Sequence, residues 1–247
     1  MALNKSKGNM YDWVNVTWNT VKGICPHDCT YCYCKAIAKR FNAPQKSVHF
    51  DEKELKTNLG SGNFIFVGSS NDMFAKDIPD EWIIKTLAHC LRFDNKYLFQ
   101  TKNPDKVKEF MTYFLPKEML IGNSAHKMWQ NSCICTTLET NRHYPDVMCN
   151  SPKPEERVAA MEELKNHITT YVTVEPIMDF DLEEFVSFLK RCNPKQVNIG
   201  ADSGKNGLPE PSREKVLELI AELEKFTVVK QKSNLKRLLE WKQKTIF

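Results

Sequence analysis

Short runs of β-branched and aromatic residues alternate along this chain with amphipathic helical runs. The strands predicted from them are 14–19, 64–67, 97–101, 133–139, 171–175, 196–201 and 227–230. The predicted helices are 33–41, 51–59, one opened by Pro79, one opened by Pro104, 155–167, 181–192, 212–224 and 235–242, and 122–131 is predicted to be irregular. Strands that alternate with helices of this length specify parallel βαβ units with right-handed crossovers. The pattern therefore predicts an α/β fold with a parallel sheet.

The number of strands narrows the architecture. Seven predicted strands favour a parallel (βα) barrel that does not close completely, and a doubly wound open sheet is the alternative. In both folds the chemistry belongs at the carboxyl ends of the strands. The chain has 247 residues and shows neither a low-complexity linker nor a sequence repeat, so we expect a single domain over 1–247.

A cysteine motif follows the first predicted strand directly. Its spacing is C-x3-C-x2-C, formed by Cys25, Cys29 and Cys32, with Tyr31 just before the last cysteine. Thiolates are soft ligands that suit zinc, copper(I) or iron–sulfur clusters. A 4Fe–4S cluster held by three cysteines leaves one iron without a protein ligand, where a small chelating molecule can bind. A zinc site completed by Cys34 or His27 is the alternative, because zinc usually takes four ligands.

Composition excludes several classes of protein. No run of about 18 apolar residues is present, so no membrane span is expected. The first residues lack the apolar core of a signal peptide and the nine cysteines are odd in number, which favours a cytoplasmic protein with free thiols and a metal site over a disulfide framework. The net charge of +4 permits an anionic substrate without requiring a nucleic-acid polymer.

The period-two alternation of strands sorts their side chains into two sets. Ile134, Val172, Val174, Val197 and Ile199 belong to the set predicted to pack against helices. The set predicted to face inward comprises Gln100, Lys102, Cys135, Thr137, Glu139, Thr173, Glu175, Asn198, Gly200, Asp202, Lys230 and Lys232. It is polar towards the carboxyl ends, whereas a barrel interior is normally branched and apolar. We therefore expect a polar site there; the simpler interpretation is that these are exposed strand-end residues.

Several segments carry a family resemblance, in this order: 16–19, 69–74, 137–141, 174–178, 200–204 and 229–231. Together with the cysteine motif they make the chain resemble the radical S-adenosylmethionine (SAM) superfamily, and within it the small phage-type radical SAM proteins. The chain looks most similar to the queuine lyase branch. The resemblance implies a partial (βα)6 barrel with an extra C-terminal strand and helix. It also implies two cofactors, a 4Fe–4S cluster and SAM, whose reductive cleavage yields a 5′-deoxyadenosyl radical.

The same resemblance implies roles for residues by strand order. Cys25, Cys29 and Cys32 would be the metal ligands. Ser69, Ser70 and Asn71 would hold the methionine end of SAM, Thr137 and Glu139 its ribose, and Gly200 would let the adenine approach the backbone. The Gly-Gly-Glu usual in the superfamily is absent after the second strand, where Ser69-Ser70-Asn71-Asp72 stands instead. The contact with the amino group of SAM must therefore be made differently.

The expected activity is that of a lyase in queuosine salvage. It would release the 7-deazaguanine base queuine from queuosine or queuosine 5′-phosphate by abstracting a ribose hydrogen. Glu175, Asp202 and Lys230 are the catalytic candidates, and Asp72, Lys102, Arg142, Glu175, Asp202 and Lys230 are the substrate-binding candidates. A carboxylate can accept paired N–H donors of the base, and a cation can take a phosphate.

The expected partners are a small nucleoside or nucleotide substrate and a flavodoxin- or ferredoxin-type electron donor, with no membrane and no nucleic acid. One alternative function is a radical SAM enzyme that modifies or repairs a base within tRNA or DNA. Another alternative is a metal-binding module without catalysis, which would leave the polar strand ends unused.

Overall fold

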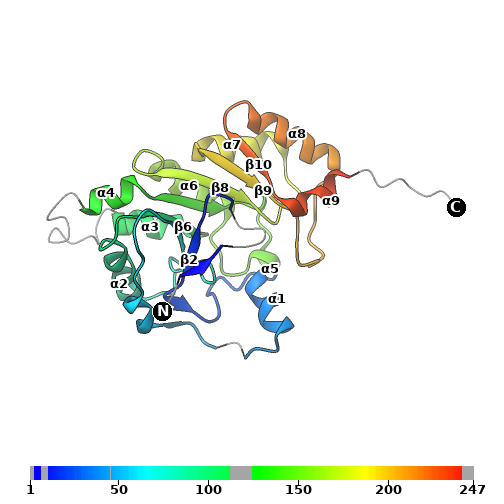
Figure 1. Cartoon of the computed structure of the whole chain (residues 1–247). Helices are drawn as coiled ribbons and strands as arrows, with labels where there is room; N and C mark the ends of the chain where they lie inside the picture. Colours follow the sequence, from blue (N-terminus) through cyan, green and yellow to red (C-terminus); the bar gives the residue numbers. More distant parts are fainter. Residues whose placement is uncertain (1–2, 7–10, 45, 112–123, 241–247) are drawn as a thin grey trace.

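One large sheet organises the molecule. The computed structural model describes residues 3–6, 11–44, 46–111 and 124–240. Eight strands follow one another in the order β1-β2-β5-β6-β7-β8-β9-β10 (Figure 1). They are β1 (Asn4–Lys5), β2 (Val16–Trp18), β5 (Phe64–Val67), β6 (Lys96–Thr101), β7 (Cys133–Thr137), β8 (Thr169–Val174), β9 (Gln196–Ile199) and β10 (Val228–Gln231). Only β1 runs antiparallel to its neighbour, so the predicted α/β fold with a parallel sheet is confirmed.

The strand order decides between the two predicted architectures. From β2 to β10 the parallel strands lie in chain order, whereas a doubly wound sheet reverses its order at a switch point. Within the described ranges β10 pairs with β9 and not with β2, so the barrel is open on that side. A separate two-stranded sheet, β3 (Val21–Lys22) with β4 (His49–Phe50), follows the first barrel strand and was not predicted. The fold is therefore an incompletely closed parallel barrel.

The described residues form helices, most of which cover the outer face of the sheet (Figure 1). They are α1 (Tyr33–Arg40), α2 (Asp80–Cys90), α3 (Pro104–Glu109), α4 (Ser124–Gln130), α5 (Pro145–Met148), α6 (Pro154–Leu164), α7 (Leu182–Cys192), α8 (Arg213–Glu224) and α9 (Lys236–Leu239), with 3-10 turns η1 (Glu52–Lys56) and η3 (Ser233–Leu235). Helices α3, α6, α7 and α8 pack side by side in that order, and α1 and α5 lie apart from them (Figure 1). None of the helices in the described ranges combines the length and apolar content that crossing a bilayer requires.

Two predictions of local structure were wrong. The segment 122–131 was expected to be irregular, but residues 124–130 form α4. Met128 and Trp129 are buried there, and the Trp129 ring lies 5.5 Å from that of Phe99. Tertiary packing stabilises a short helix that has no strong sequence signal of its own. The expected helix over 51–59 is only the 3-10 turn η1, and residues 241–242 of the expected last helix lie outside the described residues.

The alternation of strand side chains is confirmed. Ile134, Val172, Val174, Val197 and Ile199 all belong to the main hydrophobic cluster beneath the helices. A second cluster fills the inside of the barrel and contains Tyr11, Val14, Phe66, Leu98, Cys133, Cys135 and Tyr171. The segment that precedes β2 contributes Tyr11 and Trp13, which stack with ring centroids 5.1 Å apart. The inner face of the barrel is thus apolar and aromatic in its lower part, away from the carboxyl ends of the strands.

Candidate active site

The cysteine loop lies at the carboxyl end of β2 and touches the loop that follows β5. Asn71 donates from Nδ2 to the carbonyl of Gly23 at 3.0 Å, and the Cys34 thiol donates to the carbonyl of Ser70 at 3.3 Å. The Tyr33 hydroxyl donates to the carbonyl of Ser69. The segment Ser69–Asn71 is therefore held against the residues that flank the cysteine motif on both sides, as a shared cofactor site requires.

The three motif thiols lie in different environments. Cys29 is buried, and its Sγ lies 3.1 Å from Ser151 Oγ. Burial, with the nearby Asp72 charge, raises the pKa of Cys25 to about 12. A hydrogen bond from Cys34 lowers the pKa of Cys32 to about 5 despite partial burial, and Lys102 adds to the effect. Within the described residues no three His, Cys, Asp or Glu side chains converge as ligands of a single metal ion would.

The donor set fits an iron–sulfur cluster with SAM on its open iron. Three thiols of one loop supply the soft ligands that such a cluster needs. Next to them, Asn71 is 5% exposed, and its Oδ1 is a buried acceptor without a hydrogen-bond partner. A buried acceptor in this position suits an ammonium donor, because an unpaired buried polar atom is otherwise costly.

Asp72 ties the cysteine loop to β6. Its Oδ2 accepts hydrogen bonds from His27 Nε2 at 2.8 Å, Thr101 Oγ1 at 2.9 Å and the Lys102 amide at 2.8 Å. Its Oδ1 accepts one from the Phe74 amide at 3.0 Å. Although burial favours the neutral carboxyl, His27 and the other donors hold the pKa of Asp72 below its usual value. Asp72, predicted as a substrate ligand, is thus fully engaged within the protein.

Glu139 forms the centre of a buried charge network. Its side chain and that of Arg157 are both fully buried, and Arg157 Nη1 donates to Glu139 Oε2 at 2.8 Å. Lys102 Nζ lies 3.2 Å from Oε1, which also accepts the Tyr31 hydroxyl. Burial alone would raise the pKa of Glu139, but Arg157 and Lys102 outweigh it and hold the pKa at about 2. Both carboxylate oxygens of this predicted ribose ligand are occupied.

A second ion pair lies at the end of the neighbouring strand, because Glu175 follows β8 and Glu139 follows β7. Lys232 Nζ is 2.5 Å from Glu175 Oε2, and Asn234 Nδ2 donates to Glu175 Oε1 at 2.8 Å. A side chain on Gly200 would have its Cβ 2.6 Å from Glu175 Oε1 and 2.9 Å from Asn234 Oδ1. The missing side chain of Gly200 therefore makes the room that Glu175 and Asn234 occupy. Lys232 also lies 4.9 Å from the centre of the Tyr11 ring.

Below this pair, strand register places four inward side chains in one row: Thr137, Thr173, Asn198 and Lys230. Gln100 donates to Thr137 Oγ1 at 3.3 Å, and Gln196 donates to Asn198 Oδ1 at 2.7 Å. Thr173 and Asn198 are 2% and 3% exposed, and Thr173 Oγ1 and Asn198 Nδ2 have no hydrogen-bond partner. The row thus offers adjacent unused polar atoms inside the barrel.

Three predicted site residues are placed differently from the rest. Arg142 pairs with Asp179 and Asp181 on the surface. Asp202 turns into its own loop and accepts hydrogen bonds from the backbone amides of residues 204 and 206. Lys230 remains half-exposed at the end of the inner row, 3.9 Å from Asp12.

Comparison with known proteins gives the family. A sequence profile described as "Protein of unknown function (DUF5131)" matches residues 9–179, well over half of the chain. The chain belongs to the DUF5131 family. No curated protein matches it.

Solved structures that resemble the DUF5131 chain include two of spore photoproduct lyase. The complex with dinucleoside spore photoproduct matches with a TM-score of 0.61 and 10% identity, over 90% of this chain and 78% of that chain. A mutant with bound AdoMet and dinucleoside spore photoproduct matches with a TM-score of 0.59 and 10% identity, over 92% and 80%. At this identity the likeness establishes a shared fold over nearly the whole chain.

Sequence reasoning missed several side chains at the site of this DUF5131 chain: Tyr31, Arg157, Lys232 and Asn234 as partners of the two carboxylates. Arg157 carried a signal, since it occupies the apolar stripe of α6 between Pro154, Val158 and Met161. A lone charge at a buried helical position usually has a buried partner. Lys232 and Lys230 were predicted on the same inward face, so the alternation pattern alone could not tell which of the two lysines pairs with Glu175.

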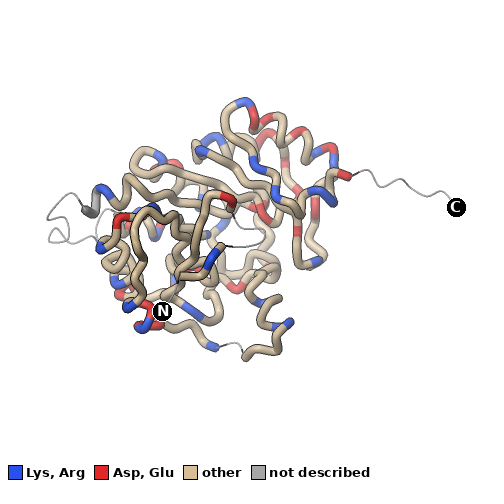
Figure 2. Tube along the Cα trace, in the orientation of Figure 1, with Lys and Arg blue, Asp and Glu red and all other residues tan. Residues whose placement is uncertain are grey.

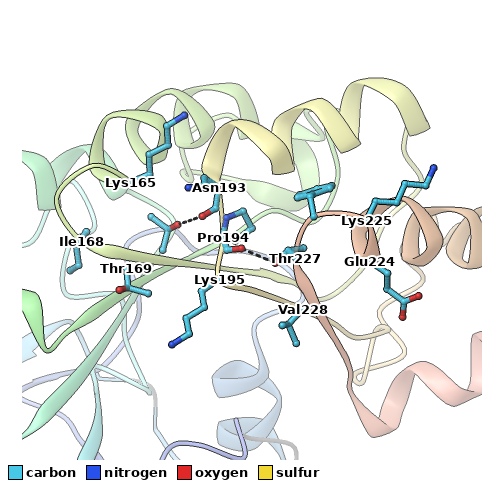
Figure 3. Close-up of a pocket in the computed structure, with 12 residues that line it drawn as sticks. Lys165, Ile168, Thr169, Asn193, Pro194, Lys195, Glu224, Lys225, Thr227 and Val228 are labelled. Atoms are coloured by element: carbon cyan, nitrogen blue, oxygen red, sulfur yellow. Dashed lines mark hydrogen bonds between the residues drawn. The ribbon is translucent and has the colours of Figure 1, made fainter.

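The DUF5131 chain also has a hollow at the opposite, amino-terminal ends of the strands (Figure 3). It measures about 690 Å³ and is lined by the segments that enter β8, β9 and β10, among them Thr169, Lys195 and Val228. In α/β barrels the chemistry belongs at the carboxyl ends, where the cysteine loop and both ion pairs of this chain lie. Size alone therefore does not make this hollow the active site.

Proposed function

We propose that this chain is a radical SAM enzyme whose motif cysteines hold a 4Fe–4S cluster, with SAM on the open iron. The observation that carries the proposal is the contact of the cysteine loop with Ser69–Asn71 at the carboxyl ends of the barrel strands. The fold shared with a lyase that binds AdoMet supports it. When bound, the two cofactors supply hydrogen-atom abstraction by a 5′-deoxyadenosyl radical.

The residues of this chain position the cofactors. Asn71 Oδ1 accepts a hydrogen bond from the amino group of SAM, so a neutral amide replaces the carboxylate of the usual Gly-Gly-Glu. Thr137 Oγ1 accepts a hydrogen bond from Gln100, so its hydroxyl hydrogen is left to donate to the ribose of SAM. Lys102 places positive charge near Cys29 and Cys32, which favours deprotonated cysteines.

The substrate we propose is queuosine or its 5′-phosphate, from which queuine is released after abstraction of a ribose hydrogen. Asn198 Nδ2 donates to the carbonyl of the base. Glu175 already accepts from Lys232 and Asn234, and the remaining lone pairs of its carboxylate accept the N–H groups of the base. Lys230, half-exposed at the end of the same row, takes the 5′-phosphate. Asp202, Lys102 and Arg142 have partners elsewhere in the protein, so we assign them no contact with the base.

Anaerobic turnover tests the function. Reconstituted enzyme with SAM and a reductant should convert queuosine 5′-phosphate to queuine and 5′-deoxyadenosine, as measured by mass spectrometry. Substrate that carries deuterium on the ribose should pass it to 5′-deoxyadenosine. Queuine released without SAM would identify a simple glycosidic hydrolase and reject the radical mechanism.

A base within tRNA or DNA is the second candidate substrate. The observation that favours it is the fold match with spore photoproduct lyase complexed with dinucleoside spore photoproduct. The same incubation with bulk tRNA and duplex DNA decides between the two. SAM-dependent change of a polymer without queuine release would assign the polymer substrate, and gel shift across salt concentrations would report its phosphate contacts.

A further inference from the structure

Helix α1 presents an apolar face to solvent. Tyr33 and Ile37 of α1 and its C-cap residue Phe41 are spaced four residues apart, so they lie along one face of the helix, and they are 53%, 49% and 70% exposed. Ile24 of the cysteine loop is 38% exposed. No residue of α1 is buried. These four side chains, called the α1 face below, are four of the seven exposed large hydrophobic residues in the described ranges. Three of them follow one another along one side of α1, and such a concentration of apolar side chains is typical of an interaction site.

The surroundings of the α1 face are basic. Residues 24–46 contain four lysines or arginines and a single acidic residue, Asp28, which pairs with Lys35. Lys39, Arg40 and Lys46 form no ion pair with any described residue. Figure 2 shows basic positions, in blue, along α1. Unpaired cations around an apolar patch favour an acidic partner, because complementary charge accelerates and orients association.

The α1 face lies beside the proposed cluster site. Cys32 is the N-cap of α1, so the helix begins immediately after a proposed iron ligand. The side chains of Tyr33 and Cys34 contact the carbonyls of Ser69 and Ser70, which holds the first turn of the helix against the SAM-binding loop. Helix α1 is thus the outer wall of the site, and a protein docked on it comes close to the cluster.

We propose that the α1 face docks an acidic protein that carries single electrons. The inference rests on the proposed function, since the cluster must receive one electron for each SAM that is cleaved. The partner's reduced cofactor is oxidised by one electron, the cluster is reduced by one electron, and no atom is transferred. Four exposed side chains form a small patch, and electron-transfer encounters use interfaces of less than about 1,200 Å².

A nucleic acid fits the α1 face less well. Polymer binding draws its affinity from many phosphate contacts, and only three unpaired cations surround this patch. Ile24 and Ile37 are aliphatic, so they provide no stacking surface for bases. Burial against an apolar protein surface uses all four side chains.

Charge reversal with two reductants tests the docking. The reconstituted enzyme is the double variant Lys39→Glu/Arg40→Glu, and the probe is a purified acidic flavodoxin. In calorimetry with oxidised flavodoxin, the Kd of the double variant should be at least about tenfold larger than that of wild type. The difference should shrink as the salt concentration rises, because salt screens charge. SAM cleavage driven by reduced flavodoxin should fall in parallel, whereas cleavage driven by dithionite, which needs no docking, should not change. Ile37→Ser, which does not change the charge of the α1 face, should also raise the Kd for flavodoxin.

The matched control is Lys225→Glu, an exposed lysine that lines the hollow at the opposite end of the barrel. It should leave the Kd and both rates as in wild type. Equal flavodoxin affinity in wild type and the double variant would overturn the docking proposal. So would a double variant that keeps flavodoxin affinity but loses binding to a tRNA or duplex DNA probe. If wild type cleaves no SAM even with dithionite, the proposed function fails, and the binding measurement still judges the docking separately.

Discussion

Replacing Glu139 by Gln should lower the stability of the protein strongly at neutral pH. The substitution keeps the shape of the side chain but removes its charge, while Arg157 and Lys102 keep theirs inside the protein. Arg157 is fully buried and cannot recover solvation, and its Nη2 already lacks a hydrogen-bond partner. The variant therefore leaves buried positive charge without its counterion, which is the costly way to break a buried ion pair.

The magnitude follows from two independent routes. The pKa of Glu139 is about 2 instead of the ordinary 4.5, a difference that corresponds to roughly 3 kcal/mol. Removal of one partner of a buried pair costs about 3–5 kcal/mol. Because the folded-state pKa lies below the unfolded value, the stabilisation is present above about pH 5 and is lost as the pH falls to about 2. At about 3 kcal/mol the melting temperature should drop by roughly 6–12 °C.

The loss of unfolding free energy is measured by denaturant unfolding followed by circular dichroism. Wild type and Glu139→Gln are compared at the same cluster content. Glu163→Gln is the control, because this exposed carboxylate, 61% exposed and paired with Lys108, should contribute little. The free energy of unfolding of wild type should fall more steeply than that of Glu139→Gln between about pH 5 and pH 2. A loss below about 1 kcal/mol at pH 7, or parallel pH profiles, would refute the reasoning.

Three further predictions concern the site. The triple replacement of the motif cysteines by Ala should abolish iron binding, whereas about four irons per chain in the variant would reject the cluster assignment. Asn71→Leu should weaken SAM binding about tenfold or more in calorimetry. Asn71→Asp keeps the acceptor but loses the hydrogen bond to the Gly23 carbonyl, so it should bind SAM more tightly than Asn71→Leu. Gly200→Ala should displace Glu175, whose Oε1 lies 2.6 Å from the new Cβ, so substrate turnover should fall. If turnover by Gly200→Ala equals that of wild type, Glu175 does not position the substrate.

The alternation and β-propensity of the strands were sufficient to predict a parallel α/β fold, and the strand order of the structure then decided for the barrel. The strand 64–67 has the predicted bounds, because the run Phe-Ile-Phe-Val is apolar and β-forming and ends at Gly68, whose φ of +80° breaks the strand. Alternation then separated Ile134 and Val172 from Cys135 and Thr173 correctly. These features depend on the local sequence alone, which is why they were predictable.

Partner choice in the site depends on tertiary structure and was not predictable. The period-two alternation of strand side chains places Lys230 and Lys232 on one face. However, β10 ends at Gln231, so Lys232 lies beyond the strand and reaches Glu175. By the same alternation Asp202 should face inward like Asn198. The chain leaves the sheet after β9, however, and the Asp202 carboxylate accepts hydrogen bonds from the loop that follows. Alternation holds only while the backbone stays in the sheet.

The two carboxylates divide the inner face by function. Glu139 is held from α6 and β6, next to the cysteine loop, and its charge is fully compensated. Glu175 is held by Lys232 and Asn234, from the segment after β10. The partnerless atoms of the inner row, Thr173 Oγ1 on β8 and Asn198 Nδ2 on β9, lie below Glu175 and are neutral, so a ligand bound to them is recognised by its hydrogen-bonding edge. The first pair therefore belongs to the proposed cofactor half of the barrel and the second to the proposed substrate half.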